Sequence, residues 1–182
     1  MKRKNLVAKS QAKKNPKTKR IYDKFKKVIF KNINKKIFAI GVSGGPDSLC
    51  LAYLSQLYSL EFSTKIHVLI VNHNLRKESY REALKVKRML KNKKIKSKIL
   101  NWKGKIPNSN IQKKARDARY SLIFDYCAKK NINYLVTAHH RDDQIENFFI
   151  RLFRGSGLTG LASMQENVSY NKNLKIIRPF LN

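Results

Sequence analysis

Apolar residues in this chain gather in two kinds of segment that alternate along it. Ile37–Val42 and Ile66–Val71 are short continuous apolar runs, the pattern of strands buried on both faces of a sheet. Ile21–Lys35 and Asp47–Leu60 instead carry apolar residues every three or four positions, the pattern of helices that bury one face. This regular change of period predicts βαβ units.

The same alternation continues and predicts the α/β fold class, a parallel sheet with helices on both faces in a Rossmann-like arrangement. Ile95–Leu100, in which lysines separate the apolar residues, has the pattern of a strand nearer the sheet edge. Ligands bind such sheets at the carboxyl ends of the strands, so chemistry is expected there. The other predicted helices are Ser79–Asn92, Ser109–Lys130 and His139–Phe153, and the other predicted strands are Asn133–Ala138 and Lys175–Pro179.

Charge is the strongest departure of this composition from that of an average protein. The 182 residues contain 41 Lys and Arg against 11 Asp and Glu, a formal net charge of +30. Such a field attracts polyanions and favours a nucleic-acid partner, although a bias toward solvated lysines is the alternative. The apolar runs are far shorter than the roughly 18 residues of a membrane span, so no membrane partner is expected.

The N-terminal residues and the cysteines bear on the compartment. Residues 1–20 are basic and lack the apolar core of a signal peptide, which predicts a flexible basic arm before one domain over residues 21–182. A transit peptide is the alternative, which the scarcity of hydroxyl residues disfavours. Cys50 and Cys127 form no CxxC pair and no Cys/His cluster, which fits a reducing compartment. A cytoplasmic location is therefore expected.

A glycine-rich turn ends the first predicted strand and opens a helix. Its two glycines let the backbone approach an anion, and the N–H groups at the helix start can hold phosphate oxygens. Two serines add hydroxyl donors, whereas Asp47 repels phosphate and is expected to bind a bridging Mg²⁺. An ordinary tight turn with Asp47 as helix cap is the alternative. The predicted ATP-binding residues are Ser43, Gly44, Gly45, Pro46, Asp47 and Ser48.

A second polar block, His-His-Arg-Asp-Asp-Gln-Ile-Glu over residues 139–146, follows the fourth predicted strand. If the helix begins near His139, then His139, Asp143 and Glu146 fall at i, i+4 and i+7 and share one face. An imidazole and two carboxylates at a strand's carboxyl end can bind Mg²⁺ or move the proton of an amine. A helix cap with solvated charges is the alternative.

Ser-Gly-Gly-Pro-Asp-Ser resembles the pyrophosphate loop of the N-type ATP pyrophosphatases, or PP-loop enzymes, which cleave ATP to AMP and pyrophosphate while adenylating a substrate. Further blocks in the same order make the chain similar to the tRNA(Ile)-lysidine synthetase family. The resemblance covers roughly Ile37 to Phe180. Besides the polar block, these blocks are Val71–Arg76, Ala115–Tyr120 and Arg-Gly-Ser-Gly-Leu-Thr-Gly-Leu over residues 154–161.

The resemblance implies a reaction and its partners. ATP adenylates the C2 oxygen of the wobble cytidine in an isoleucine tRNA with a CAU anticodon. The amine of free L-lysine then displaces AMP and gives lysidine. The cofactors implied are ATP and Mg²⁺, and a homodimer is left open.

The resemblance also implies a role for each matching residue. The glycine-rich turn binds ATP, and Asp47 holds its Mg²⁺. The implied catalytic residues are Arg119, which contacts the nucleotide or the activated base, and His139, Asp143 and Glu146, which line the reaction centre and lysine site. Arg151 and Arg154, around the flexible turn, are expected to contact RNA phosphates.

Two departures from the family pattern qualify this interpretation. Asn72 stands where many relatives have Asp, which weakens a metal role there. Family members also continue past the Arg178-Pro179-Phe180 block into small tRNA-recognition domains. Those domains are expected to be absent from this chain, which is then a fragment, a truncated reading frame or a minimal form.

Two other functions stay open. A related PP-loop enzyme that thiolates tRNA would share the glycine-rich turn but would typically carry cysteines for its sulfur chemistry. A truncated, non-catalytic RNA-binding module would bind tRNA in a salt-sensitive way without activating ATP.

Overall fold

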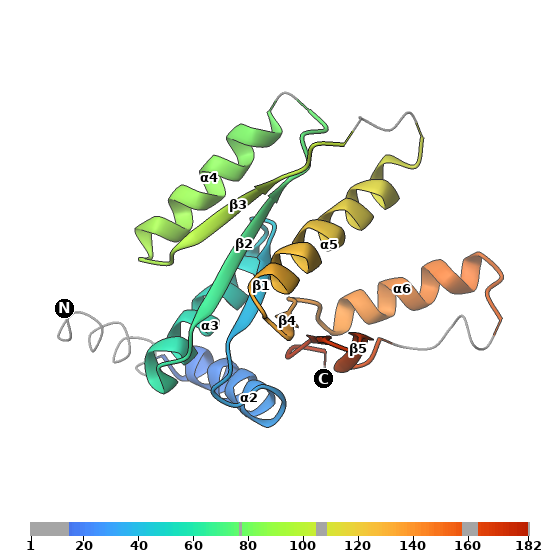
Figure 1. The fold of residues 1–182 in the computed structure, drawn as a ribbon. Helices are drawn as coiled ribbons and strands as arrows, with labels where there is room; N and C mark the ends of the chain where they lie inside the picture. The colour runs from blue at the N-terminus through green and yellow to red at the C-terminus, as the bar shows by residue number, and fades with distance from the viewer. Residues whose placement is uncertain (1–14, 77, 105–108, 158–163, 182) are drawn as a thin grey trace.

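The computed structural model describes residues 15–76, 78–104, 109–157 and 164–181. Its helices and strands alternate along the chain, as Figure 1 shows. The helices are α2 (Pro16–Asn32), α3 (Pro46–Phe62), α4 (Ser79–Asn92), α5 (Ile111–Lys129) and α6 (Arg141–Phe153). The strands are β1 (Phe38–Val42), β2 (Ile66–Asn72), β3 (Ser97–Asn101), β4 (Tyr134–Val136), β5 (Asn167–Asn171) and β6 (Leu174–Ile177).

The strands form one mostly parallel sheet in the order β3-β2-β1-β4-β6-β5. The predicted α/β class is therefore confirmed, and β3 lies at the edge as its alternating lysines indicated. Strand β5 was not predicted. It pairs antiparallel with β6, so the sheet is mixed at that edge. None of the described helices is long and apolar enough to cross a membrane.

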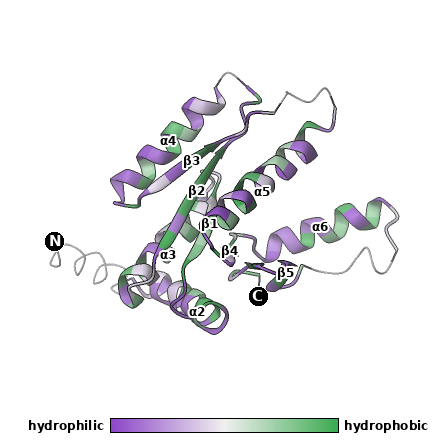
Figure 2. Ribbon diagram, in the orientation of Figure 1, coloured by the Kyte–Doolittle hydropathy of each residue, from purple (hydrophilic) through white to green (hydrophobic). Residues whose placement is uncertain are grey.

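Successive residues of the central strands face opposite sides of the sheet and build two cores. Phe38 and Ile40 of β1 belong to the larger core, with buried residues of α2, α3 and α4. Ala39 and Leu69 belong to the smaller core, together with Ile123 of α5. Helices thus cover both faces, and Figure 2 shows the apolar colour concentrated along the inner strands.

Helices α3 and α5 begin within two residues of their predicted starts, at Pro46 and Ile111, and α2 and α6 also begin elsewhere than predicted. Helix α2 begins at Pro16, because the Asn15 side chain accepts hydrogen bonds from the backbone N–H groups of Lys17 and Thr18. Residues 16–20 of the predicted arm therefore lie in a helix, and residues 1–14 lie outside the described part. Helix α6 begins at Arg141 instead of His139, which changes the geometry of the polar block.

Candidate active site at the carboxyl edge of the sheet

The sheet order places a switch point between β1 and β4. From β1 the chain continues to β2 and β3 on one side, whereas from β4 it continues to β6 on the other. Segments that leave the two strands diverge and open a crevice at their carboxyl ends. A cavity of about 360 Å³ lies there. Among the predicted residues, those that line it are Ser43, Gly45, Asp47, Ser48, Arg119, His139 and Asp143.

Gly44 gives the turn after β1 its shape. Its φ of +97° lies in the region that residues with a side chain rarely adopt. A Cβ added there would also lie 2.5 Å from Cγ2 of Val86 on α4, well inside contact distance. Gly45 differs, because its φ is −70° and an added Cβ would lie 3.8 Å from the Ser43 hydroxyl oxygen. Both the backbone conformation and the approach of α4 thus require glycine at position 44.

The Ser48 hydroxyl organises the same turn from the first turn of α3. Its Oγ accepts the backbone N–H groups of Ser43 and Gly44, both at 3.2 Å, and donates to the Gly45 carbonyl at 2.9 Å. Ser48 is buried, so these bonds are shielded from water. The turn therefore curls around one hydroxyl and leads into the start of α3, whose first backbone N–H groups have no acceptor within the helix. These donors at the helix start are suited to an anion.

Asp47 and the polar block meet through His140. The His140 Nε2 lies 3.6 Å from an Asp47 carboxylate oxygen and 3.8 Å from an Asp143 carboxylate oxygen. His140 also caps α6, because its Nδ1 accepts the N–H of Asp142 while Asp143 accepts the N–H of His140 at 2.8 Å. This reciprocal capping box explains why the helix begins at Arg141.

The carboxylates fit a cation that is shared with substrate. Among the described residues, no group of three or more His, Cys, Asp or Glu side chains could hold a metal ion without further ligands. Asp47, however, has 58% of its side chain exposed at the cavity that holds the donor-rich turn. Mg²⁺ typically takes one or two carboxylates together with substrate phosphates and water. Asp47 is therefore a fitting Mg²⁺ ligand only when phosphates complete the coordination.

Arg119 of α5 reaches the cavity beside His73, which follows β2. The Nε and Nη2 atoms of Arg119 both lie 3.3 Å from the Nε2 of His73. Since a guanidinium only donates, His73 accepts there and carries its proton on Nδ1, which is buried without a partner among the described residues. Burial and then Arg119 lower the pKa of His73, which keeps it neutral. The orphaned Nδ1–H is a donor available to a ligand.

His139 lies between β4 and α6, and its imidazole is also held neutral. Its Nδ1 lies 2.9 Å from the Thr137 hydroxyl. Burial, followed by the cationic side chains of Arg178 and Arg116, lowers its pKa to about 4, although Asp143 acts in the opposite direction. A neutral imidazole in a cavity can accept a proton from a substrate.

Three predicted site residues on α6 lie away from this cavity, whereas Gly44 and Pro46 belong to the turn beside it without lining it. Glu146 is exposed and does not line it, and the expectation that His139, Asp143 and Glu146 share a helical face is wrong because His139 precedes the helix. Arg151 is half-buried and Arg154 exposed, both at the far end of α6. Asn72 is used structurally, since it bonds the Asn101 side chain at 3.1 Å.

Sequence reasoning missed several residues in the cavity or beside it. His73 lines it and His140 lies beside Asp47 and Asp143, and neither was singled out, although each is the second polar residue after a predicted strand. Arg116 lines the cavity, and its guanidinium carbon lies 5.4 Å from the centre of the Tyr120 ring, in cation–π range. Arg178, whose Nε is buried without a partner among the described residues, follows β6.

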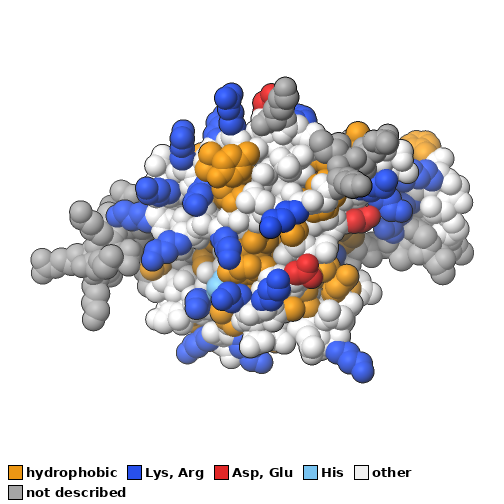
Figure 3. All heavy atoms as spheres, turned by 45° about the horizontal axis from the view of Figure 1, so that its top comes forward, with side chains coloured by type: hydrophobic (Ala, Val, Ile, Leu, Met, Phe, Trp, Pro, Cys, Tyr) orange, Lys and Arg blue, Asp and Glu red, His pale blue; other side chains and the backbone are white. Residues whose placement is uncertain are grey.

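A second cavity of about 380 Å³ lies on the other side of Asp47 and His140. It also contains Arg141 and Asp142 from the start of α6. The face shown in Figure 3 carries many Lys and Arg side chains and few acidic ones. Anionic ligands that approach this face would therefore meet a basic surface.

Comparison with known proteins agrees with this geometry. Residues 17–182 match the family of PP-loop domains. The chain is 46% identical over 144 residues to the tRNA(Ile)-lysidine synthase of Orientia tsutsugamushi, covering 79% of this chain and 32% of that protein. It is 42% identical over 163 residues to the tRNA(Ile)-lysidine synthase of Wolbachia pipientis, covering 85% of this chain and 38% of that protein. The chain thus spans about a third of the length of these relatives.

The fold also has a counterpart among solved structures. The U34-tRNA thiolase NcsA from Methanococcus maripaludis superposes with a TM-score of 0.73 at 21% identity, covering 89% of this chain and 58% of that one. At this identity the likeness concerns the fold alone.

Proposed function

Because the chain belongs to the PP-loop domain family, we propose that it is the ATP-binding catalytic part of a tRNA(Ile)-lysidine synthase. The observation that carries the proposal is the cavity itself. It joins a donor-rich turn to Arg119, His139 and Asp143, in a chain similar to lysidine synthases over most of its length. The proposed reaction joins lysine to C2 of the wobble cytidine of a CAU-anticodon tRNA(Ile). A cytoplasmic location follows from this role.

The first half-reaction needs phosphates to be held and charge to be neutralised. The backbone N–H groups at the start of α3 would bind the phosphates of ATP, with the Gly44 bend allowing close approach. Mg²⁺, when bound through Asp47, supplies positive charge to the departing pyrophosphate. The cytidine C2 oxygen attacks the α-phosphorus, and the bond to pyrophosphate breaks. Arg119 would orient the nucleotide or the activated base from the opposite wall.

The second half-reaction needs a neutral amine. The amine of lysine bonds to C2, AMP leaves with the C2 oxygen, and one proton must depart from the nitrogen. His139 is proposed to take that proton on Nε2, in the tautomer whose Nδ1–H donates to the Thr137 hydroxyl. Asp143, which lines the cavity, is proposed to hold the other, protonated amine of lysine, and Arg151 and Arg154 are proposed to contact tRNA phosphates.

The cysteines favour this reaction over tRNA thiolation. Burial raises the pKa of the Cys127 thiol to about 11, so it stays protonated and a poor nucleophile. Burial and then Asp47 raise the pKa of the Cys50 thiol as well. Replacing both with Ala is expected to leave lysidine formation intact, whereas a thiolase using them would lose activity.

The test is incubation with ATP, Mg²⁺, labelled lysine and CAU-anticodon tRNA(Ile), with ATP–pyrophosphate exchange followed separately. Exchange that depends on tRNA, together with lysine incorporation, is expected. Asp47→Asn should abolish both while leaving tRNA binding nearly unchanged, and Asp125→Asn, at an exposed position on α5, is the matched control. Salt-sensitive tRNA binding with neither exchange nor incorporation would identify a passive RNA-binding module and refute the proposal.

A further inference from the structure

A row of aromatic rings leads from the cavity to the edge of the sheet. Tyr120 and Phe124 lie one turn apart on α5, and their ring centres are 5.4 Å apart. The Phe124 ring centre lies 4.0 Å from that of Tyr170 on β5, the outermost strand. Arg116, one turn before Tyr120, extends the row at its other end, with its guanidinium carbon 5.4 Å from the Tyr120 ring centre. We call these side chains the aromatic row.

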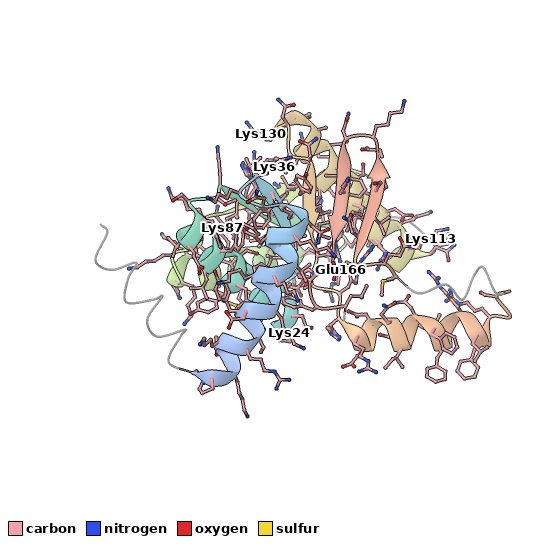
Figure 4. The ribbon with its side chains drawn as sticks, turned by 90° about the horizontal axis from the view of Figure 1, so that it is seen from below. Lys24, Lys36, Lys87, Lys113, Lys130 and Glu166 are labelled. Carbon is pink, nitrogen blue, oxygen red and sulfur yellow. The ribbon has the colours of Figure 1, made fainter. Side chains whose placement is uncertain are left out.

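The aromatic row begins in the candidate active site and ends in solvent. Arg116 and Tyr120 line the cavity that also contains His139 and Asp143. At the other end, 55% of the surface of Tyr170 is exposed. Strands β5 and β6 lie side by side at that edge of the sheet, as Figure 4 shows. A ligand too long for the cavity would therefore continue along these rings.

Packing accounts for the inner rings but not for Tyr170. Tyr120 and Phe124 are half-buried and pack against the smaller core. Strand β5, in contrast, is polar and almost entirely exposed, so a large ring gains little burial there. An exposed tyrosine that contacts an inner ring is placed to bind a ligand.

The charges at the cavity end of the row suit an anion. Among the described residues, no ion pair joins Arg116 or Arg178 to a carboxylate. Burial lowers the pKa of Arg178, and Arg116 lowers it as well while Tyr120 acts in the opposite direction, so these three side chains lie near one another. Helix α5 carries five Lys and Arg against two Asp. Guanidinium groups without a carboxylate partner match the oxygens of a phosphate.

Rings that continue into guanidinium groups fit unpaired RNA. Every base has a face that stacks on an aromatic ring, and arginine stacks on bases or binds the phosphates between them. A duplex hides those faces, and an apolar peptide would leave both guanidinium groups without a counter-charge. We propose that the aromatic row binds the unpaired nucleotides next to the base that enters the cavity. This inference rests on the proposed function and adds the path by which the RNA strand leaves the site.

The first test measures the affinity for a CAU-anticodon stem–loop RNA by fluorescence anisotropy at moderate salt. Tyr170→Ser should weaken binding at least about fivefold because one stacked base is lost, whereas Tyr170→Trp should keep the affinity. Tyr80→Ser is the matched control and should change nothing, since Tyr80 is similarly exposed, at 49%, on α4 at the other face of the sheet. Equal affinity of the unsubstituted protein and Tyr170→Ser would overturn the proposal, as would an equal loss for a blunt RNA duplex of the same length.

The second test reports stacking and phosphate contact separately. The fluorescent base 2-aminopurine replaces, in turn, the nucleotide on each side of the target cytidine. Binding should quench it at one of these positions, and Tyr170→Ser should remove most of that quenching. Arg116→Gln should reduce the slope of log affinity against log salt by about 0.7, the loss of one phosphate contact, whereas Arg88→Gln on α4 should leave it unchanged. Undiminished quenching in Tyr170→Ser would refute the stacking.

Lysine incorporation distinguishes this inference from the proposed function. Tyr170→Ser should raise the KM for tRNA at least about fivefold. If the unsubstituted protein incorporates lysine and Tyr170→Ser alters neither KM nor RNA affinity, the aromatic row is refuted and the function stands. If no lysine is incorporated while Tyr170→Ser still loses affinity for the stem–loop, the function fails and the RNA-binding row is retained.

Discussion

Replacing Gly44 with Ala tests the two features that require glycine in the turn after β1, its left-handed backbone conformation and its close contact with α4. Ala would have to adopt a φ of +97°, and its Cβ would lie 2.5 Å from Cγ2 of Val86. Gly45→Ala is the matched control in the next residue. There φ is −70° and the added Cβ would meet only the Ser43 hydroxyl at 3.8 Å, an ordinary contact.

The magnitude follows from these two costs. A left-handed conformation costs an alanine about 1–2 kcal/mol, and forcing a methyl group into a packed contact costs about 1–3 kcal/mol more. Gly44→Ala should therefore lower the free energy of unfolding by about 2–5 kcal/mol. Gly45→Ala should change it by less than about 1 kcal/mol, because a weaker helix cap is offset by a less flexible unfolded chain.

The assay is urea unfolding of both variants and of Val86→Ala, alone and combined with Gly44→Ala. Val86→Ala removes the clashing methyl group but not the φ penalty, so the double variant should recover about 1–3 kcal/mol relative to additivity. Strict additivity would show that α4 moves away freely. Equal destabilisation by the two glycine replacements would refute the description of the turn.

Three further predictions concern the walls of the cavity. Because burial and then Arg178 hold the pKa of His139 at about 4, the unfolded chain binds the extra proton first. His139 should therefore contribute a loss of stability of about 3 kcal/mol as pH drops from 6.5 to 4, and His139→Gln should remove that part of the slope in unfolding titrations, leaving the parts from His67 and His73. Arg119→Lys loses the forked contact with His73 and should slow ATP–pyrophosphate exchange at least about tenfold with little change in melting temperature. A fall in melting temperature as large as the loss of exchange would contradict a role for Arg119 in the reaction. Ser48→Ala leaves two loop N–H groups without their acceptor and should cost about 1–3 kcal/mol by urea unfolding, and a neutral result would contradict the loop geometry.

Local patterns predicted the main elements, because each carries its own period. The Ser79–Asn92 helix appears residue for residue as α4, whose apolar positions recur at helical spacing. The β5 strand was missed because Asn-Val-Ser-Tyr-Asn is mostly polar and lies at an edge, where burial leaves no clear signal. Its place comes from pairing with β6, a contact that no local pattern encodes.

The site was predicted only as far as topology brings strand ends together. Asp47 and Asp143 each follow a buried strand, so their meeting near one cavity follows from the parallel sheet. The contact between Arg119 and His73 does not, because it depends on how α5 crosses β2. The start of α6 was misplaced because His140 caps the helix through its ring nitrogen, a role that residue type does not favour.

Helix α6 marks the point where the amphipathic pattern stops being informative. The apolar spacing that predicted helices packed on the sheet holds for α4, whose Ala83, Val86 and Leu90 are buried. The same kind of spacing in α6 predicted a helix correctly but buries nothing within the described chain. The spacing of apolar residues shows which side of a helix is apolar. It does not show what that side packs against, because this depends on the direction in which the helix leaves the sheet. Only the first turn of α6 lies at the cavity, so the apolar side chains of Ile145, Phe149 and Phe153 farther along the helix have no cover among the described residues.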